Sequence, residues 1–367
     1  MSETVFILGA GASQEAGAPL MNDFIDVAYD LRKRLTNENE IVWKFDLVFK
    51  ALTALEASVA KANIDLQNVE SVFAAFEMAK LLGRLGSLSV EEVNNLPMAM
   101  TKVIERTLEE TISFPVTGVE GQRKVAPPIP YGDFVELIQE ITDGDTKPQR
   151  VSILTFNYDV CLDYALHFNS LPVNYGLDEQ RKEGIKLFKL HGSTSWILCP
   201  GCNQVVPWYL EQFFTNRNWR LWPEDASKRL DVAAKTKEFK HCGDTPAAGP
   251  MLIPPTWNKA EYHRQLSNVW RAAAAEFADA ENIIVSGYSL PETDHFFRYL
   301  YALGATGGGG RLKRFLVFDP DKDVESKFKS LLGPLAASRF CFYDFPFKGA
   351  IPTVRNILGI KSNQKRA

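Results

Sequence analysis

A group of polar side chains follows a short apolar run near the middle of the chain, in the stretch Thr155-Phe156-Asn157-Tyr158-Asp159. The run 151–156 has the composition of a buried strand, so these polar groups stand at a strand end. The amide of Asn157 can position a water molecule or a ribose hydroxyl. The carboxylate of Asp159 can accept from a ribose or cap the following helix, and the residues alone leave both roles open.

A histidine ends another candidate strand, 185–190, in the stretch Lys189-Leu190-His191-Gly192-Ser193. Histidine is the side chain whose ordinary pKa allows proton transfer near neutral pH. Gly192 would let a substrate come close to it. A lone histidine at a strand end is more often structural, so only the neighbouring motifs favour a catalytic role for His191.

The first candidate strand ends in a turn of small residues, Gly9-Ala10-Gly11-Ala12-Ser13. The apolar residues before Gly9 suit a buried parallel strand, and the two glycines would let backbone amides approach a pyrophosphate. A helix after the turn would add its positive N-terminal end. The dinucleotide fingerprint has a third glycine where this chain has Gln14, so the turn alone fits both nucleotide binding and a plain tight turn.

Two later strand ends carry further candidates for ligand contact. Gly287 and Ser289 follow the apolar run 282–286, where they could contact a ribose or a phosphate. Asp319 follows the run 314–318 and could bind a ribose diol, as acids at strand ends do. A proline comes next, so Asp319 is equally suited to starting a turn.

Four potential metal ligands lie in a segment of irregular composition. Cys199 and Cys202 form a Cys-x-x-Cys turn, which places two thiolates on one face of a tetrahedral zinc, and His241 and Cys242 follow later. Cys242 belongs to no second Cys-x-x-Cys pair, so His241 or an outside ligand would have to complete the site. The alternatives are a structural zinc, a metal-free remnant and a redox-active pair.

The elements that must position these residues are strands alternating with helices. Alternation of this kind predicts an α/β fold, namely a Rossmann-like, doubly wound parallel sheet whose ligands sit beyond the carboxyl ends of the strands. Every candidate outside the cysteine group falls at such an end. The candidate strands are 5–8, 151–156, 185–190, 282–286 and 314–318.

Two insertions interrupt this alternation, so we expect residues 1–367 to form a single catalytic domain. A helical insertion covers approximately 36–125, and a small cysteine-containing insertion covers approximately 199–249. Within the helical insertion, Pro97 predicts a break between helices. The stretch 114–130 has little periodicity and predicts a connection across the surface.

Composition excludes several classes of protein. Hydrophobic residues make up 46% of 367, enough for a large core. A net charge of -4 and a pI near 5.9 argue against direct binding of nucleic acid. No uncharged stretch approaches the roughly twenty residues that cross a bilayer, and no signal peptide is present. Five cysteines do not make a disulfide framework, so we expect a cytoplasmic protein with reduced thiols.

Taken in order, these motifs resemble those of the sirtuin family. The likeness is to Gly-Ala-Gly-x-Ser with Gly-Ile-Pro, Thr-Gln-Asn-Ile-Asp, His-Gly, Cys-x-x-Cys and Gly-Thr-Ser-Leu, with Asp319 in the place of a ribose-contacting Asn. Order across six short motifs is far more specific than any one of them, and the helical insertion is the part it leaves uncovered. The corresponding stretches are Gly9 to Ser13, Gly17-Ala18-Pro19, Thr155 to Asp159, His191-Gly192, Cys199 to Cys202 and Gly287 to Leu290.

The resemblance implies an NAD-binding Rossmann-like domain in which the bond between nicotinamide and ribose is cleaved. Asn157 would hold a water or the ribose, Asp159 would support it, and His191 would act as base toward a ribose hydroxyl. The residues implied to contact NAD+ are Gly9, Ala10, Gly11, Ser13, Gly17, Pro19, Thr155, Gly287, Ser289 and Asp319.

One departure from the family bears on the substrate. Sirtuin deacylases carry a Phe-Gly-Glu strand that pairs with the acyl-lysine peptide, where this chain has Leu252-Ile253-Pro254-Pro255-Thr256. Successive prolines cannot donate the hydrogen bonds that such pairing uses. The resemblance therefore favours an NAD+ glycohydrolase of the sirtuin-like kind found in bacterial antiphage defence, with NAD+ as its substrate.

Three further expectations accompany this hypothesis. An enzyme that depletes a shared cofactor must be held inactive, so family analogy predicts a homo-oligomer or a partner, such as an ATPase or another defence protein. A protein deacylase or ADP-ribosyltransferase is the alternative within enzymes. A module that senses NAD+ or ADP-ribose without turnover is the alternative from another class.

Overall fold

The computed structural model of the protein describes most of the chain. The described residues are 3–35, 39–59, 64–119, 121–143, 149–178, 181–215, 221–243, 249–253, 264–291, 294–307 and 311–360.

A seven-stranded parallel sheet forms the centre of the molecule, in the order β13-β12-β11-β1-β4-β6-β5. Parallel strands covered on both faces are apolar throughout, and all five residues of β1, β4 and β11 are buried. The α/β class and the doubly wound sheet expected from the sequence are confirmed. The strands are β1 (Thr4–Leu8), β4 (Val151–Thr155), β5 (Val173–Asn174), β6 (Ile185–Lys189), β11 (Asn282–Ser286), β12 (Arg314–Phe318) and β13 (Phe340–Tyr343).

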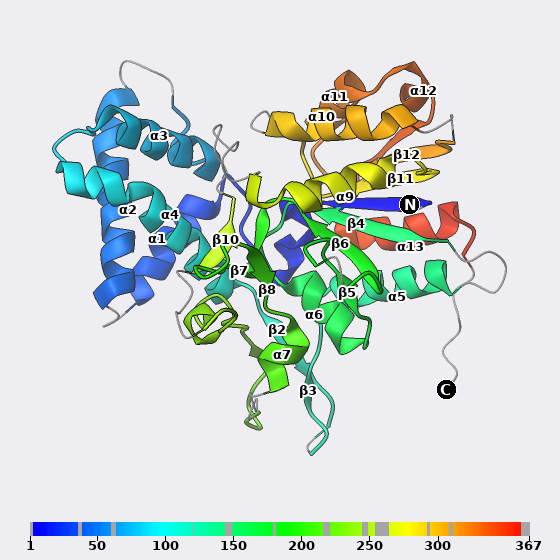
Figure 1. The fold of residues 1–367 in the computed structure, drawn as a ribbon, viewed down its shortest axis with the longest axis horizontal. Coiled ribbons are helices and arrows are strands. Elements are labelled where there is room, and N and C mark those ends of the chain that lie inside the picture. Colours follow the sequence, from blue (N-terminus) through cyan, green and yellow to red (C-terminus); the bar gives the residue numbers. More distant parts are fainter. Residues whose placement is uncertain are drawn as a thin grey trace.

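The first strand lies in the middle of the sheet, between β4 on one side and β11 on the other. Strand order therefore reverses at β1, and the crevice at the carboxyl end of such a strand is where open α/β sheets bind their ligands. Figure 1 shows these carboxyl ends pointing toward a separate group of helices.

Helices cover both faces of the sheet. Figure 1 shows α9 and α10 on one side, and α5 and α13 on the other. The helices that flank the sheet are α5 (Tyr131–Thr142), α6 (Cys161–Phe168), α9 (Ser267–Phe277), α10 (His295–Gly304), α11 (Asp323–Leu331), α12 (Pro334–Ala337) and α13 (Phe347–Ile357).

Four helices form the group that faces the carboxyl ends, and we call it the helical block: α1 (Phe24–Arg34), α2 (Asn39–Val59), α3 (Val69–Leu82) and α4 (Val90–Thr111). Asn68 caps α3 through its side chain, and Ser89 with Glu92 forms a capping box on α4. The expected break at Pro97 is wrong, because α4 continues through this residue. The buried face of α4, which includes Leu96 and Met100, holds the helix together across the proline.

Two small antiparallel sheets lie beside the main one. One contains β10 (Pro250–Leu252), β7 (Gly192–Leu198) and β8 (Val205–Pro207), and the other contains β3 (Lys124–Val125), β2 (Phe114–Thr117) and β9 (Ser227–Lys228). The stretch 114–130 is therefore not a plain surface connection, because Phe114 and Val125 are buried and anchor its two strands. The cysteine-containing segment also carries α7 (Leu210–Thr215) and the 3₁₀ turn η3 (Thr236–Glu238).

The helix expected directly after the first glycine turn is absent from this described part of the chain. Two short 3₁₀ turns, η1 (Ala10–Ala12) and η2 (Gln14–Ala16), follow β1 instead, and α1 begins only at Phe24. Turns of three residues supply no helix macrodipole, so that part of the phosphate-binding argument is wrong. A further 3₁₀ turn, η5, spans Ala305–Gly307.

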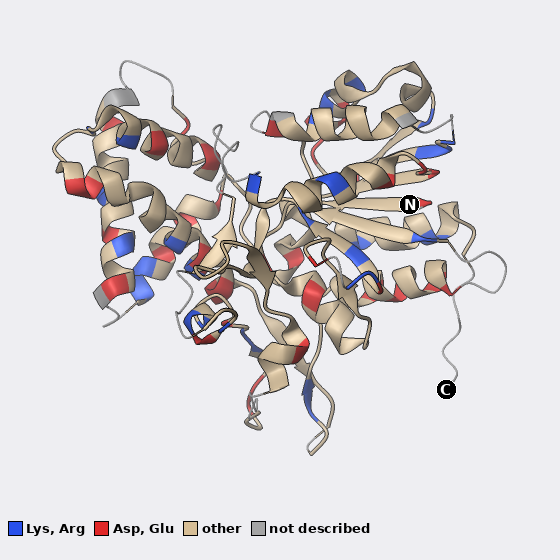
Figure 2. Cartoon of the chain, in the orientation of Figure 1, with Lys and Arg blue, Asp and Glu red and all other residues tan. Residues whose placement is uncertain are grey.

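The distribution of charged residues over the structure agrees with the small net charge of the chain. Acidic and basic residues alternate over the helices in Figure 2, without segregation of one sign onto one group of elements. None of the described helices is long and apolar enough to cross a membrane.

A buried glutamate joins the helical block to the cysteine-containing segment. Glu109 on α4 accepts hydrogen bonds through Oε1 from the backbone N–H groups of Ala233 (2.6 Å) and Ala234 (3.4 Å). Burial, and next the neighbouring charge of Glu105, raise the pKa of Glu109 to about 8. Its Oε2 atom is buried without a hydrogen-bond partner among the described residues, as suits a protonated acid.

This glutamate predicts a pH dependence of stability. Because the pKa of Glu109 is higher in the folded chain than its ordinary value of 4.5, the stability it contributes is complete at low pH and is lost as pH rises toward about 8. Glu109→Gln should remove this loss, which is at most about 1.4 kcal/mol per pH unit. Urea unfolding at several pH values between 5 and 8 measures it. Glu91→Gln, at an exposed position of the same helix, is the control, and equal pH profiles for wild type and Glu109→Gln would contradict the assignment.

Candidate functional site

The loops after β1 and β11 interlock through their backbones. A Cβ atom on Gly9 would lie 2.5 Å from the carbonyl oxygen of Gly287, and one on Gly11 would lie 2.8 Å from the Cα of Gly287. Gly287 itself has φ of +62°, and its Cβ would lie 2.4 Å from the nitrogen of Ala12. Only glycine fits at these three positions.

This interlock gives Gly9 and Gly11 a structural role that differs from the predicted contact with a pyrophosphate. The N–H of Gly11 donates to the carbonyl of Gly287 (2.9 Å), and the N–H of Gly9 donates to the carbonyl of Ser286 (3.2 Å). These two amides therefore hold the loops together, whereas the sequence suggested that they would face a pyrophosphate. A role of Gly9, Ala10, Gly11 and Gly287 in contact with NAD+ stays a prediction.

Ser13 is the centre of a buried hydrogen-bond network. Its hydroxyl donates to Oδ2 of Asp159 (2.7 Å), lies 2.7 Å from the hydroxyl of Tyr131 and accepts from Nδ2 of Asn157 (3.0 Å). Burial, and next the charge of Asp159, raise the pKa of Tyr131 well above its ordinary value, so this phenol keeps its proton. Since the Ser13 proton goes to Asp159, Tyr131 is the donor to Ser13.

Asn157 is held through one end of its amide. Nδ2 donates to the carbonyl of Gly9 (2.9 Å) as well as to Ser13, and the backbone N–H of Asn157 donates to Oγ1 of Thr155 (3.1 Å). Thr155 is buried and acts here on the backbone. Both side-chain bonds of Asn157 use Nδ2, so Oδ1 is the atom with which it can accept a hydrogen bond from a water or a hydroxyl.

Asp159 bonds both the start of the next helix and Ser13, whereas its contact with a ribose stays a prediction. Oδ1 accepts from the N–H of Cys161, the first residue of α6, and Oδ2 accepts from Ser13. The capping alternative is thus realised together with a contact to the predicted site.

The buried side chain of Lys189 stabilises the loop that carries Asp159. Nζ of Lys189 donates to the carbonyl oxygen of Asp159 and to Oδ2 of Asp163 (2.8 Å), and the side chains of this ion pair are each 1% exposed. Tyr175 donates to the other oxygen of Asp163 (2.6 Å). A buried ion pair needs such additional hydrogen bonds, and here they fix the backbone at Asp159.

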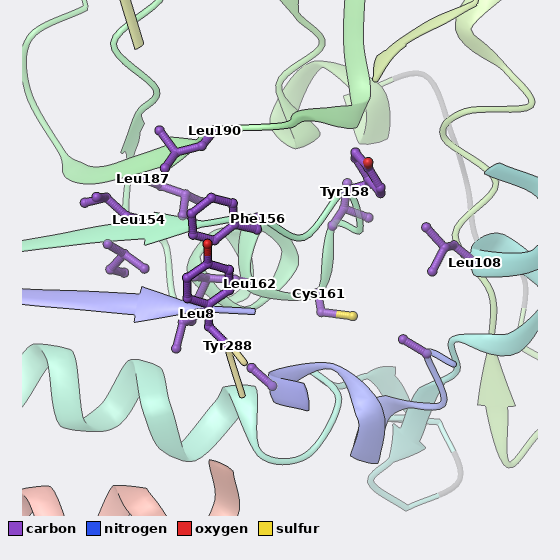
Figure 3. Packing of buried hydrophobic residues seen from close by; sticks show 14 of the residues in the cluster. Leu8, Leu108, Leu154, Phe156, Tyr158, Cys161, Leu162, Leu187, Leu190 and Tyr288 are labelled. Carbon is purple, nitrogen blue, oxygen red and sulfur yellow. The ribbon is translucent and has the colours of Figure 1, made fainter. Parts of the chain in front are cut away.

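His191 lies at the end of β6, buried among aromatic rings. Its ring is 5.0 Å from that of Phe156, which stacks face to face on Tyr288 at 4.1 Å. Figure 3 shows the rings of Phe156 and Tyr288 one above the other at the ends of the strands. Nε2 of His191 lies 3.4 Å from Oδ1 of Asp294.

A small pocket of about 40 Å³ opens at the carboxyl ends of β1 and β4. Predicted site residues form one side of it and apolar residues of the helical block form the other. The described lining does not include His191, which lies behind Phe156. The lining residues are Ala10, Ser13, Ala18, Pro19, Met21, Phe24, Val69, Ile104, Leu108, Phe156, Asn157, Tyr158 and Asp159.

The helical block is attached close to this pocket. Gly17 has φ of +104°, and a Cβ there would lie 2.4 Å from the carbonyl oxygen of Thr111 at the end of α4. The N–H of Val69 donates to the carbonyl of Met21 (3.1 Å). Gly17 is thus required for packing of the block, and Pro19 lines the pocket beside it.

Two candidates lie farther along the sheet edge. Ser289 is exposed in the loop after β11. Asp319 is buried after β12, and its Oδ1 accepts from the N–H of Asp321 (2.9 Å), which is the turn that the sequence offered as an alternative. Burial raises the pKa of Asp319. Their contact with a ribose remains a prediction.

The four predicted metal ligands come together in the cysteine-containing segment. One ligand atom each from Cys199, Cys202, His241 and Cys242 lies within 4.8 Å of all the others. Nδ1 of His241 is 3.6 Å from Sγ of Cys202 and 3.3 Å from Sγ of Cys242. A tetrahedral zinc with Zn–S bonds of about 2.3 Å places its ligands about 3.8 Å apart, so this donor set fits zinc after a small contraction.

Sequence reasoning missed three residues of the site. Tyr131 reaches Ser13 from α5, 118 positions away, and nothing in its neighbourhood marks it. Asp294 stands beyond the loop that follows β11, and Lys189 is the residue before the Leu190-His191 pair. The position of Lys189 at the end of an apolar run was the one available clue, because the last three residues of β6 are buried and a buried lysine requires a partner.

Comparison with known proteins gives a likeness of fold. No protein-family model and no curated protein matches the sequence. Similar solved structures include a Sir2 homologue in complex with NAD, at 18% identity and a TM-score of 0.37, covering 97% of this chain and 91% of that chain. A mutant Sir2 homologue with ADP-ribose has 16% identity and a TM-score of 0.37, covering 99% and 96%. At this level of similarity, activity has to be argued from the residues of the site itself.

The glycine interlock predicts a large loss of stability on substitution. In Gly287→Ala the new Cβ would collide with backbone atoms of the loop after β1. The alanine would also have to adopt the left-handed backbone conformation that Gly287 has. We expect the free energy of unfolding to fall by about 2–5 kcal/mol, measured by urea denaturation. Gly333→Ala is the matched control, since a Cβ there meets nothing within 4 Å. Equal stability of the two variants would contradict the interlock.

The cysteine cluster predicts one bound zinc per chain. Metal analysis of protein purified with zinc should find it in wild type and lose it in Cys202→Ser, and a chelator should lower the melting temperature of wild type only. Cys341→Ser, at an exposed cysteine outside the cluster, should keep the metal. A disulfide between Cys199 and Cys202 in protein without metal would favour the redox alternative instead.

Proposed function

We propose that the protein is an NAD+ glycohydrolase that cleaves NAD+ to nicotinamide and ADP-ribose with water as acceptor. The observation that carries the proposal is the meeting of Asn157, Asp159 and Ser13 in one hydrogen-bonded group on a pocket at the centre of the sheet. The residues come from motifs far apart in the chain and resemble, in order, those of sirtuins.

The reaction assigns a role to each group. The nicotinamide ring would enter the pocket between the first glycine loop and the helical block. Oδ1 of Asn157 would hold the water or a ribose hydroxyl, and the Ser13 network with Asp159 would keep Asn157 in place. His191 would act as the base.

The step balances without another reactant. The bond between C1′ of the ribose and the nicotinamide nitrogen breaks, and its electron pair leaves with nicotinamide. The oxygen of water then bonds to C1′, and the proton of that water passes to a base and on to solvent. A pocket walled by apolar side chains favours the loss of the positive charge that the pyridinium carries.

The proposal includes NAD+ contacts from the other predicted residues. Gly9, Ala10, Gly11, Gly17, Pro19 and Thr155 would surround the nicotinamide ribose, and Gly287, Ser289 and Asp319 would lie along the rest of the dinucleotide. These contacts rest on the resemblance and on the position of the residues along the carboxyl ends of β1, β11 and β12.

One feature of the sequence argues against peptide deacylation, namely the successive prolines Pro254 and Pro255. The segment that would pair with an acyl-lysine peptide begins at β10, whose Leu252 pairs with Gly192, and the N–H of Ile253 donates to the carbonyl of His191 (2.7 Å). β10 lies at the edge of its small sheet and pairs only with β7 among the described residues, so its other side is not paired there. Pro254 and Pro255, on which the sequence argument depended, lie outside the described residues.

The test follows nicotinamide release from NAD+ by purified protein. We expect Asn157→Ala and His191→Ala to lower the rate by at least about 100-fold, because both groups act on the reacting atoms. Asn356→Ala, at an exposed position of α13, is the matched control. Equal rates for wild type and both site variants would contradict the catalytic assignment.

The same assay separates the alternatives. A deacylase would release nicotinamide only with an acyl-lysine peptide, and a transferase would attach ADP-ribose to a protein. Intact NAD+ after long incubation, together with a raised melting temperature, would favour a sensing module.

We further propose that the enzyme acts in antiphage defence by depleting NAD+ and is controlled by self-association or by a partner, such as an ATPase. Analogy with the sirtuin-like family supports this step. Nicotinamide release at increasing protein concentration, with and without a co-purifying partner, measures that control.

A further inference from the structure

We propose that Asp294 is a positioning residue that orients the imidazole of His191 for proton transfer. The inference rests on the proposed function, since it concerns the base of that reaction. Oδ1 of Asp294 lies 3.4 Å from Nε2 of His191, and the two side chains are 5% and 7% exposed. At this burial the carboxylate and the ring face each other with little screening by water.

The direction of the Asp294 side chain supports this role. Asp294 stands at the N-cap position of α10, where an aspartate ordinarily accepts from the first N–H groups of the helix. Its side chain makes no such capping bond. It faces His191 and Tyr288 instead, so the helix start lacks the cap that this aspartate would ordinarily provide.

Tyr288 holds the second oxygen of the carboxylate. Its hydroxyl donates to Oδ2 of Asp294 (3.2 Å), and its ring is fixed by the stack on Phe156. Burial, and next the charge of Asp294, raise the pKa of Tyr288 well above its ordinary value, so the phenol keeps the proton that it donates. With Oδ2 engaged in this way, Oδ1 is directed at His191.

The contact with Asp294 determines which ring nitrogen of His191 acts as the base. A proton held on Nε2 by Asp294 makes Nδ1 the basic atom, and the negative carboxylate stabilises the imidazolium that forms when Nδ1 takes a proton. That proton comes from the water whose oxygen bonds to C1′, and it leaves the imidazolium for solvent after the reaction. Asp294 keeps its charge throughout and contacts no reacting atom.

Other charged and titratable groups surround the pair. Glu70 on α3 is buried, and it acts with Asp294 to raise the pKa of Tyr158 beyond the effect of burial. Arg298 on α10 acts on Tyr288 in the opposite sense. All of these groups remain in an Asp294→Asn variant, so a difference from wild type belongs to the carboxylate of Asp294.

The first arm of the test needs no activity. The chain has five histidines, so the ring signals of His191 are assigned in an NMR titration from their loss in His191→Gln. In Asp294→Asn we expect the titration midpoint of His191 to move to lower pH by about one unit or more, because the imidazolium loses its counter-charge. Asp321→Asn, which removes an exposed aspartate that does bond its helix start, should leave the midpoint unchanged.

The second arm measures nicotinamide release from NAD+ against pH. Asp294→Asn should lower kcat at pH 7 by at least about tenfold with KM little changed, and the acid limb of the profile should move to lower pH. A merely structural role would lower the melting temperature and leave both the acid limb and the NMR midpoint in place. That result would overturn the proposal.

Tyr288→Phe keeps the proposal testable if Asp294→Asn does not fold. Loss of the phenol leaves more of the carboxylate charge for His191, so the midpoint should rise, and an unchanged midpoint would count against the pair. The two proposals fail differently. Wild type that releases no nicotinamide refutes the hydrolase, whereas an active wild type matched by Asp294→Asn in midpoint and profile refutes only the role of Asp294.

Discussion

The close approach of two backbone turns at the end of the central strand is the constraint on which the site depends. Gly9 and Gly11 meet Gly287 at distances that admit no Cβ, so the loops after β1 and β11 have one relative position. That position fixes the carbonyl of Gly9, which in turn accepts from the amide of Asn157. A steric limit between strands therefore becomes a hydrogen-bond restraint on a side chain of the proposed reaction.

A second restraint, on the loop that carries Asp159, is electrostatic. Lys189 and Asp163 form an ion pair in the interior, where the desolvation of both groups is repaid only if their remaining hydrogen bonds are satisfied. Tyr175 and the carbonyl of Asp159 satisfy them. The same strand end therefore carries the lysine that holds the Asp159 loop and, two residues later, His191. One shift of β6 would displace both.

The sequence predicts the parts of this arrangement that are local. Buried parallel strands are continuous apolar runs, so β11 and β12 have the predicted bounds, whereas the two-residue β5 and the partly exposed β13 carry too weak a pattern to be recognised. Asn157 and His191 were identifiable because each follows its strand directly. Tyr131 and Asp294 were not, since their roles arise from contacts between distant segments. The helix break predicted at Pro97 is wrong because burial of one face of α4 outweighs the local cost of a proline inside a helix.

The helical block is the part of the structure through which a binding partner would change access to the pocket. Its side chains at Val69, Ile104 and Leu108 form one wall of the pocket, and its attachment includes the backbone bond from Val69 to Met21 and the packing of Thr111 against Gly17. Glu109 ties the same helix to the cysteine-containing segment, with no covalent link between the two except the chain itself. A binding partner or a second copy that moved α3 or α4 by a fraction of a side chain would change the width of the pocket. None of the hydrogen bonds among Ser13, Asn157 and Asp159 is made by the block, but the loop that follows Ser13 is bonded just beyond the end of α4, because the N–H of Ser113 donates to the carbonyl of Ala16 (3.1 Å). A movement of α4 would therefore reach the pocket by two routes, through the apolar wall that α4 provides and through the loop that follows Ser13.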